Sequence, residues 1–329
     1  MKDAPGIVLS TPARPVRALD AHAAGLVVVL TALGALVLYP LVLPNVLSLG
    51  ITIVLFAAMA TAWDILGGWT GQLSLGHAAF VGIGAYTMAL LFLRFGLAPW
   101  WGALLGVGAS LIVAGVWGWT TFRLRGPYFA LASIAVAELI RMVANNSARM
   151  TGGAEGLSLS TLPRLAGLDL FSRTVEFYLA LALLGLALLV AWWLSGSRLG
   201  YHLQAIREDP DAATALGVNL TRAKLTAFLL SAALTSLGGS LYGIFLGFFE
   251  PRGMFSLDLS VQLVLMAYIG GAGTVMGPLL GAALLVGGSE TLRVHFPGKS
   301  LFVYGVLIIL VVLFAPNGLS TVGRRWRRG

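Results

Sequence analysis

Long apolar runs are the feature that most constrains the fold of this chain. They recur along all 329 residues, of which 58% are hydrophobic and only 10% are charged. Soluble domains carry about 25% charged residues. A helix needs about 20 apolar residues to cross a bilayer, and several runs meet that length. The sequence therefore predicts an all-α, polytopic membrane protein with short loops and no soluble domain.

Charged residues, prolines and glycines divide the apolar sequence into about ten predicted spans. The eighth and ninth are short and rich in glycine, so the expected count is about eight to ten. The predicted spans are residues 23–43, 48–66, 78–95, 99–120, 127–145, 175–195, 224–247, 258–272, 276–291 and 301–315.

The spans predict a simple domain organisation. Residues 1–22 form a polar N-terminal tail, residues 23–316 form one transmembrane domain, and residues 317–329 form a basic tail. Two connections are long and polar, at residues 146–174 and 196–223.

Basic residues in the short loops predict the orientation, because they gather on the cytoplasmic side of a membrane. The four arginines of the 317–329 tail decide the sign. Both termini and residues 196–223 are expected in the cytoplasm, and residues 146–174 on the opposite side. The net charge of +8 is explained by these flanking residues, so no nucleic-acid partner is predicted.

A charged, helix-forming segment interrupts the apolar sequence at residues 207–217. Asp209 is suited to cap a helix, Pro210 to occupy its first position, and Gly217 to end it. The predicted helix has about two turns. Because an isolated helix of that length is unstable in water, it must be held by its own protein or by a docked partner.

Glycines and small polar residues interrupt the apolar sequence again at residues 67–77, where a continuous helix is not expected. This stretch is either an ordinary cytoplasmic loop or a broken helix beside a transport pathway. His77 is expected to be packed and hydrogen-bonded rather than to bind a ligand.

Ionisable residues within the predicted spans are few. Asp64 and Glu138 are costly in lipid and are expected to face the interior of the bundle. Glu138 and Arg141 lie three residues apart, so they share a helix face and can form an ion pair. Such a pair is either structural or part of a pathway.

Glycines spaced four residues apart are typical of helices that pack closely within a membrane. They occur at Gly67 and Gly71, Gly102 and Gly106, Gly239, Gly243 and Gly247, and Gly273, Gly277 and Gly281.

The sequence offers little for catalysis. There are no cysteines, the four histidines are scattered, and neither H-E-x-x-H nor G-x-S-x-G occurs. The triplet Gly298-Lys299-Ser300 lacks the earlier glycine of a phosphate-binding loop, since position 293 is arginine. No catalytic residue, metal site or cofactor is predicted for this chain.

Four segments resemble the LivM-type permease subunits of branched-chain amino acid ABC importers. The matching motifs are Gly126-Pro127-Tyr128-Phe129-Ala130-Leu131 with Glu138 to Arg141, Asn145-Asn146 with Thr151 to Leu157, Arg198-Leu199-Gly200 with Arg207 to Gly217 and Lys224 to Phe228, and Gly270 to Pro278. Pro316-Asn317-Gly318-Leu319 resembles the usual ending of the family. Together these motifs cover roughly residues 45–320.

The resemblance implies a non-catalytic transport subunit of a bacterial inner membrane. Its implied partners are two ATP-binding subunits of the LivG and LivF type that hold ATP and Mg²⁺, a second permease subunit of the LivH type, a substrate-binding protein that is periplasmic or lipid-anchored, and membrane lipid. The short helix at about residues 208–217 would be the coupling helix that docks on an ATP-binding subunit. The predicted coupling residues are Arg207, Glu208, Asp209, Asp211, Ala212, Ala213, Leu216 and Gly217. The candidate translocation path comprises Gln72, Ser74, Glu138 and Gln262.

Three alternatives remain open at this point. Relatives of the family carry other small solutes, such as urea or short amides. An ion-coupled secondary transporter would need buried titratable groups near the midplane, for which only Glu138 and Asp64 qualify. A membrane enzyme acting on lipids would need a cluster of histidine, aspartate or serine side chains, and none is apparent.

Overall fold

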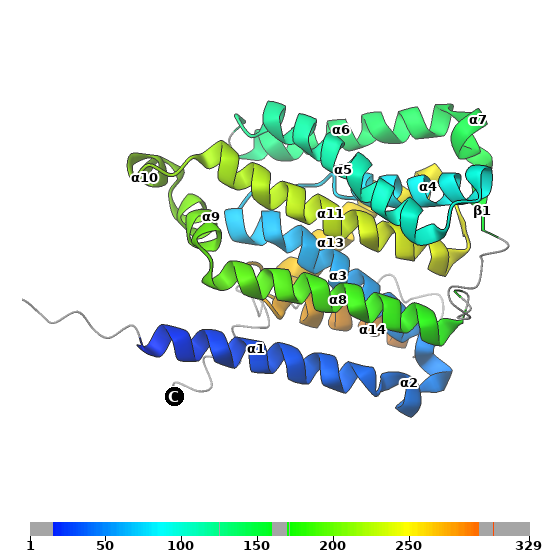
Figure 1. Cartoon of the computed structure of the whole chain (residues 1–329), viewed down its shortest axis with the longest axis horizontal. Helices are drawn as coiled ribbons and strands as arrows, with labels where there is room; N and C mark the ends of the chain where they lie inside the picture. Colours follow the sequence, from blue (N-terminus) through cyan, green and yellow to red (C-terminus); the bar gives the residue numbers. More distant parts are fainter. Residues whose placement is uncertain (1–15, 125, 160–169, 171, 296–304, 306–329) are drawn as a thin grey trace, which may run out of the picture.

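A computed structural model describes residues 16–124, 126–159, 170, 172–295 and 305. The described chain is a bundle of long, roughly parallel and antiparallel helices, which confirms the predicted fold class (Figure 1). The long helices are α1 Val16–Val37, α3 Leu47–Thr70, α4 Ala78–Phe95, α5 Pro99–Thr121, α6 Pro127–Asn146, α8 Arg173–Gly196, α11 Leu220–Leu246, α13 Leu257–Gly270 and α14 Gly277–His295. Shorter elements connect them: α2 Tyr39–Val42, η1 Pro44–Val46, α7 Ala148–Thr151, η2 Gly153–Glu155, β1 Leu157–Ser158, α9 Arg198–Glu208, α10 Pro210–Ala215, β2 Phe248–Phe249 and α12 Pro251–Met254.

Eight segments among the described residues are long and apolar enough to span a membrane. They correspond to the first eight predicted spans. Helix α14 lies where the ninth was predicted but is not one of these eight, and the tenth, residues 301–315, lies outside the described residues apart from position 305.

Three helices extend beyond the predicted spans. Helix α1 begins at Val16 rather than at residue 23, so part of the expected N-terminal tail is helical. Helix α11 begins at Leu220, four residues early, because Asn219 caps it by accepting a hydrogen bond from the backbone N–H of Arg222 (3.0 Å). Helix α3 continues through Gly67 and Gly68 to Thr70.

Helix α3 forms the centre of the bundle. Every residue from Val54 to Thr70 is buried, which is typical of a helix that is apolar all round. It packs against α8, α11, α13 and α14, while α1 and α6 lie along opposite edges (Figure 1).

The bundle has two distinct ends. We call the end that carries α9 and α10 the α10 end, and the opposite end, with α2, α7 and β1, the β1 end (Figure 1). At the β1 end, β1 pairs with β2 in antiparallel register, with Leu157 opposite Phe249. This pairing ties the connection after α6 to the connection after α11.

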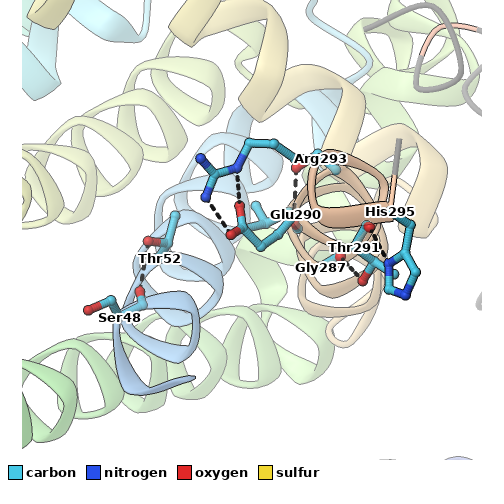
Figure 2. A network of polar contacts seen from close by, with 9 residues as sticks. Ser48, Thr52, Gly287, Glu290, Thr291, Arg293 and His295 are labelled. Carbon is cyan, nitrogen blue, oxygen red and sulfur yellow. Dashed lines mark hydrogen bonds and ion pairs between the residues drawn. The ribbon is translucent and has the colours of Figure 1, made fainter. Parts of the chain in front are cut away.

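Helix α14 returns from the α10 end and packs along α3. Its last turns carry an ion pair in which Arg293 donates to Glu290 at 2.9 and 2.6 Å, beside the first turn of α3 (Figure 2). His295 Nδ1 lies 2.9 Å from the carbonyl oxygen of Thr291, so the side chain gives a hydrogen-bond partner to a carbonyl group near the end of the helix. At the start of α3, the hydroxyl of Thr52 donates a hydrogen bond to the carbonyl oxygen of Ser48, one turn earlier in the same helix.

Glycines let the helix backbones approach closely, as their spacing predicts. A Cβ atom added at Gly239 of α11 would collide with the carbonyl oxygen of Val81 on α4. A Cβ atom at Gly281 of α14 would collide with the carbonyl oxygen of Met266 on α13. These contacts explain how α4 packs on α11 and α13 on α14 without large side chains between them.

The close contact at Gly239 predicts a selective effect of one methyl group. Gly239→Ala should destabilise the protein by about 1–3 kcal/mol, because α4 and α11 must separate to admit it. Gly108→Ala adds the same methyl to α5, where nothing lies within 4 Å, and should be neutral or stabilising. Thermal unfolding in detergent measures both variants, and equal melting temperatures would contradict the proposed tight packing.

Candidate coupling helix and the buried segment behind it

Helix α10 forms where the capping residues predicted it. The Asp209 side chain accepts hydrogen bonds from the backbone N–H groups of Asp211 (2.9 Å) and Ala212 (3.1 Å), and Pro210 occupies the first position. Gly217 ends the turn with a φ of 83°, in the region that favours glycine. The helix itself is short, because it spans only Pro210–Ala215.

A second helix precedes α10 and was not predicted as a separate element. Helix α9 contains Arg207 and Glu208 and begins at Ser197, whose side chain accepts from the backbone N–H of Gly200 (3.0 Å). Leu203 and Ile206 anchor α9 in the core. The predicted coupling segment is therefore a pair of helices joined at Asp209.

The two faces of α10 differ in what they contact. Ala213 is only 2% exposed and packs into this chain, whereas Leu216 is 84% exposed. Asp211 and Ala212 are also exposed. Ala213 was predicted as a coupling residue, but its methyl group packs into its own bundle and is not accessible on the surface of α10.

Arg207 is positioned by the fold of this chain. Its guanidinium donates to the carbonyl of Gly68 at 2.7 Å and lies 3.4 Å from the carbonyl of Ala272. These carbonyls belong to the end of α3 and to the turn between α13 and α14. Arg207 therefore joins the end of α9 to two segments that are distant in sequence.

Asp64 lies beneath the same turn. Its side chain is buried, as predicted, and both carboxylate oxygens accept from the backbone N–H of Gly273, at 2.9 and 3.0 Å. The positive charge of Arg207 also attracts this carboxylate. Gly68 permits the approach, since a Cβ atom there would collide with Asp64 and with the backbone nitrogen of Gly273.

Residues 71–77 form a non-helical segment that leads from α3 into the bundle, and Gln72, Ser74, Gly76 and His77 within it are buried. Backbone groups in such a place need partners from the protein. Ser133 of α6 accepts from the N–H of Leu75 (2.9 Å), and Trp63 of α3 donates to the carbonyl of Ser74 (2.7 Å). At the start of α4, Ser260 of α13 accepts from the N–H of Ala78 (2.9 Å). The segment therefore interrupts the helical structure inside the bundle, which agrees with the broken-helix alternative.

His77 is packed and hydrogen-bonded, as predicted. Its two ring nitrogens lie 2.8 Å from the hydroxyl oxygens of Ser74 and Ser231, and it is fully buried. Ser231 is the twelfth residue of α11, roughly 16 Å along that helix from the α10 end. Residues 71–77 therefore penetrate deep into the bundle.

The four candidate path residues do not line one surface of this chain. Gln72 and Ser74 are buried in the 71–77 segment, whereas Gln262 is exposed on α13. Glu138 pairs with Arg141, as predicted, but its side chain is 41% exposed. The expectation that Glu138 faces the bundle interior is wrong, because α6 lies at an edge and turns this flank outward.

Sequence reasoning missed the residues that hold the buried segment. Ser133, Ser231 and Ser260 are each completely buried in apolar helices. Isolated serines in such helices were a usable signal, because a buried hydroxyl needs a partner. Which partner each serine has depends on the tertiary fold.

Comparison with known proteins identifies the family. Residues 42–312 match the family model described as the branched-chain amino acid transport system / permease component. The chain belongs to this family.

Individual relatives agree with that family. The chain is 33% identical over 293 residues to the LivM high-affinity branched-chain amino acid permease protein of Salmonella typhimurium, covering 82% of this chain and 68% of the relative. The LivM protein of Escherichia coli is 32% identical over 295 residues, with the same coverage. The LivH permease protein of Salmonella typhimurium is 26% identical over 297 residues, covering 84% of this chain and 93% of the relative. No solved structure gave a significant match.

Family membership gives the α9–α10 pair a natural context. A permease component of a transport system must respond to events outside the membrane, and the α10 end presents a short helix with an exposed leucine and an exposed acid.

Within the described residues no group of three or more histidine, aspartate or glutamate side chains is arranged to hold a metal ion.

The Arg207 contacts predict a defect in transport rather than in assembly. Arg207→Ala removes the bonds to Gly68 and Ala272, and charged hydrogen bonds typically contribute about 1.5–3 kcal/mol. We expect uptake to fall by about tenfold, since 1.4 kcal/mol corresponds to that factor. Uptake is measured in reconstituted vesicles, and assembly of the transport complex is measured by gel filtration.

Arg222→Ala is the matched control, because Arg222 is an exposed arginine on the first turn of α11. Equal uptake by both variants would contradict a role for the Arg207 contacts.

Proposed function

We propose that this chain is a membrane-spanning permease subunit of an ATP-binding-cassette importer. It translocates branched-chain amino acids across the bacterial inner membrane by alternating access. The family match over residues 42–312 carries this proposal, and the similarity to the LivM and LivH branched-chain amino acid permease proteins supports the substrate class. The chain itself is non-catalytic and binds no cofactor.

Helix α10 is the proposed coupling helix. Leu216, Asp211 and Ala212 form its exposed face, with Glu208 beside it at the end of α9. Burial of this exposed leucine in a pocket on an ATP-binding subunit would stabilise docking, and the acids around it set the orientation of docking. ATP and Mg²⁺ are bound and used by two such subunits.

The α9–α10 pair is held so that a push on it reaches the membrane domain. It connects directly to α8 and, through Asn219, to α11, while Arg207 contacts the end of α3 and the α13–α14 turn. Closure of the ATP-binding subunits would therefore shift several helices together between two states.

Two further partners complete the proposed importer. A second permease subunit of the LivH type would make the membrane domain a heterodimer. A periplasmic or lipid-anchored binding protein would deliver substrate at the β1 end, where residues 146–159 lie and would contribute to the docking surface. This orientation places both termini and α10 in the cytoplasm.

Exposure divides the candidate path residues into two groups. Glu138 and Gln262 have exposed side chains, so they can face a path shared with another subunit. Gln72 and Ser74 are buried and would act by shaping the 71–77 backbone. Other small solutes, including urea and amides, are alternatives to branched-chain amino acids.

Reconstitution tests the proposed function. Vesicles that hold this chain, the second permease subunit and the ATP-binding subunits should take up leucine when ATP and a loaded binding protein are present. An ionophore that collapses proton and sodium gradients should leave uptake intact, because ATP is the energy source. Uptake that stops with the ionophore would favour an ion-coupled transporter, and transport of urea alone would overturn the substrate class.

Leu216 provides a specific test of coupling. Leu216→Asp should weaken binding of the ATP-binding subunits by about tenfold or more, since full burial of a leucine side chain contributes about 1.5–3 kcal/mol. Leu257→Asp places the same charge on an exposed leucine at the β1 end and should leave binding unchanged. Pull-down of the ATP-binding subunits measures both variants, and wild-type binding by the Leu216 variant would exclude this role. Ala213→Arg would not test the docking contact, because Ala213 is buried in its own bundle.

A further inference from the structure

Helix α6 lies at an edge of the bundle (Figure 1), and the side chains along one of its sides are exposed. Its exposed side chains recur at helical spacing, with Tyr128 67%, Leu131 63%, Leu139 62% and Met142 53% exposed. The opposite side packs inward through Phe129 and through small residues that include Ser133 and Ala137. Most of the outer side is therefore apolar and is not covered by the described residues of this chain.

An ion pair flanks this apolar stripe. Arg141 donates through Nε to one carboxylate oxygen of Glu138 at 2.8 Å, and its Nη2 contacts the other oxygen. The side chains remain 41% exposed for Glu138 and 27% exposed for Arg141. The pair is thus complete, but the part of the chain that the structure describes leaves it partly exposed.

The position of the pair along α6 makes this exposure costly. Glu138 is the twelfth of 20 residues, roughly 16 Å from the start of the helix. Arg141 reaches back toward Glu138, and hence toward the middle of the span, instead of extending to the nearer membrane surface. Charged groups at such depth normally face protein or water, because hydrocarbon solvates them poorly.

Helix α1 shows the contrasting pattern at the opposite edge of the bundle (Figure 1). Its exposed side chains between residues 25 and 37 are apolar apart from Thr31, whose hydroxyl bonds to the helix backbone. Val28 is 52% exposed in this stretch. Such a surface is suited to lipid, whereas that of α6 is not.

We infer that the exposed face of α6, with the Glu138–Arg141 pair at its flank, is the contact surface for the second permease subunit. The inference rests on the proposed function, which supplies that partner. It assigns the pair a place between two proteins, where polar groups of the partner shield it from lipid.

The similarity of the two kinds of permease supports this occupant. This chain aligns with LivM over 293 residues and with LivH over 297 residues, so the two subunits share one fold. Two like folds associate most simply about an approximate two-fold axis, with the same surface used on both sides. The regular stripe Tyr128, Leu131, Leu139 and Met142 is suited to pack against a partner helix.

Site-directed photocrosslinking in the intact importer tests the inference. A photoreactive phenylalanine derivative at Leu139 should crosslink to the second permease subunit, identified by mass spectrometry. The same residue at Val28 is the matched control and should give lipid adducts only. Lipid adducts alone at Leu139, or a crosslink to another copy of this chain, would overturn the inference.

A charge reversal gives an independent measurement. Glu138→Lys places two positive charges on the flank of α6, so we expect co-purification of the second permease subunit to fall severalfold relative to Val28→Lys. Unchanged co-purification would overturn the inference. If the Glu138→Lys variant does not accumulate in the membrane, the photocrosslinking result decides whether the inference holds.

The wild-type complex separates this inference from the proposed function. A wild-type preparation that contains no second permease subunit contradicts the proposed heterodimer itself. A preparation that contains it, but gives no crosslink from Leu139, contradicts only the assignment of α6.

Discussion

The need to satisfy backbone groups inside the bundle governs the structure around residues 71–77. This segment leaves the helical hydrogen-bond pattern where much of it is buried, so its buried N–H and C=O groups depend on side chains. Ser133, Ser260 and Trp63 supply those bonds from α6, α13 and α3. The broken segment therefore fixes the relative positions of helices that are far apart in sequence. A smooth apolar interface would fix them less precisely, because burial of apolar area has no direction.

Asp64 and Arg207 extend the same principle to the α10 end. The α13–α14 turn presents the N–H of Gly273 to Asp64 and the carbonyl of Ala272 to Arg207. The same turn is thus bound by the carboxylate of Asp64 and by the guanidinium of Arg207. The arrangement gives the proposed coupling helices a polar connection to the membrane domain, in addition to their apolar anchors.

Local chemistry made much of the fold predictable. The apolar runs placed the first eight spans, and Asp209, Pro210 and Gly217 placed α10, because hydropathy and capping act over a few residues. Tertiary contacts decided the rest. Gly67 and Gly68 suggested a break, yet α3 continues through them, since the packing of its neighbours supports the helix. Ala213 and Arg207 looked like surface residues from sequence, and only the fold shows that both engage their own chain.

The two segments that Arg207 contacts share a feature that suits them to transmit motion. Just beyond Gly68, α3 ends at Gly71, whose φ is 69°, and beside Ala272 the turn passes through Gly273, whose φ is 78°. Glycine adopts such angles at little cost, and residues at the ends of elements are where hinge motions are absorbed. A shift of α9 would pull on both places at once. Because Ser133 links the 71–77 segment to α6, the proposed path of motion runs from the coupling helix to the helix that we assign to the subunit interface. An importer that alternates between two openings must move its subunits relative to one another, and this series of contacts joins the pushed helix to the surface that has to move.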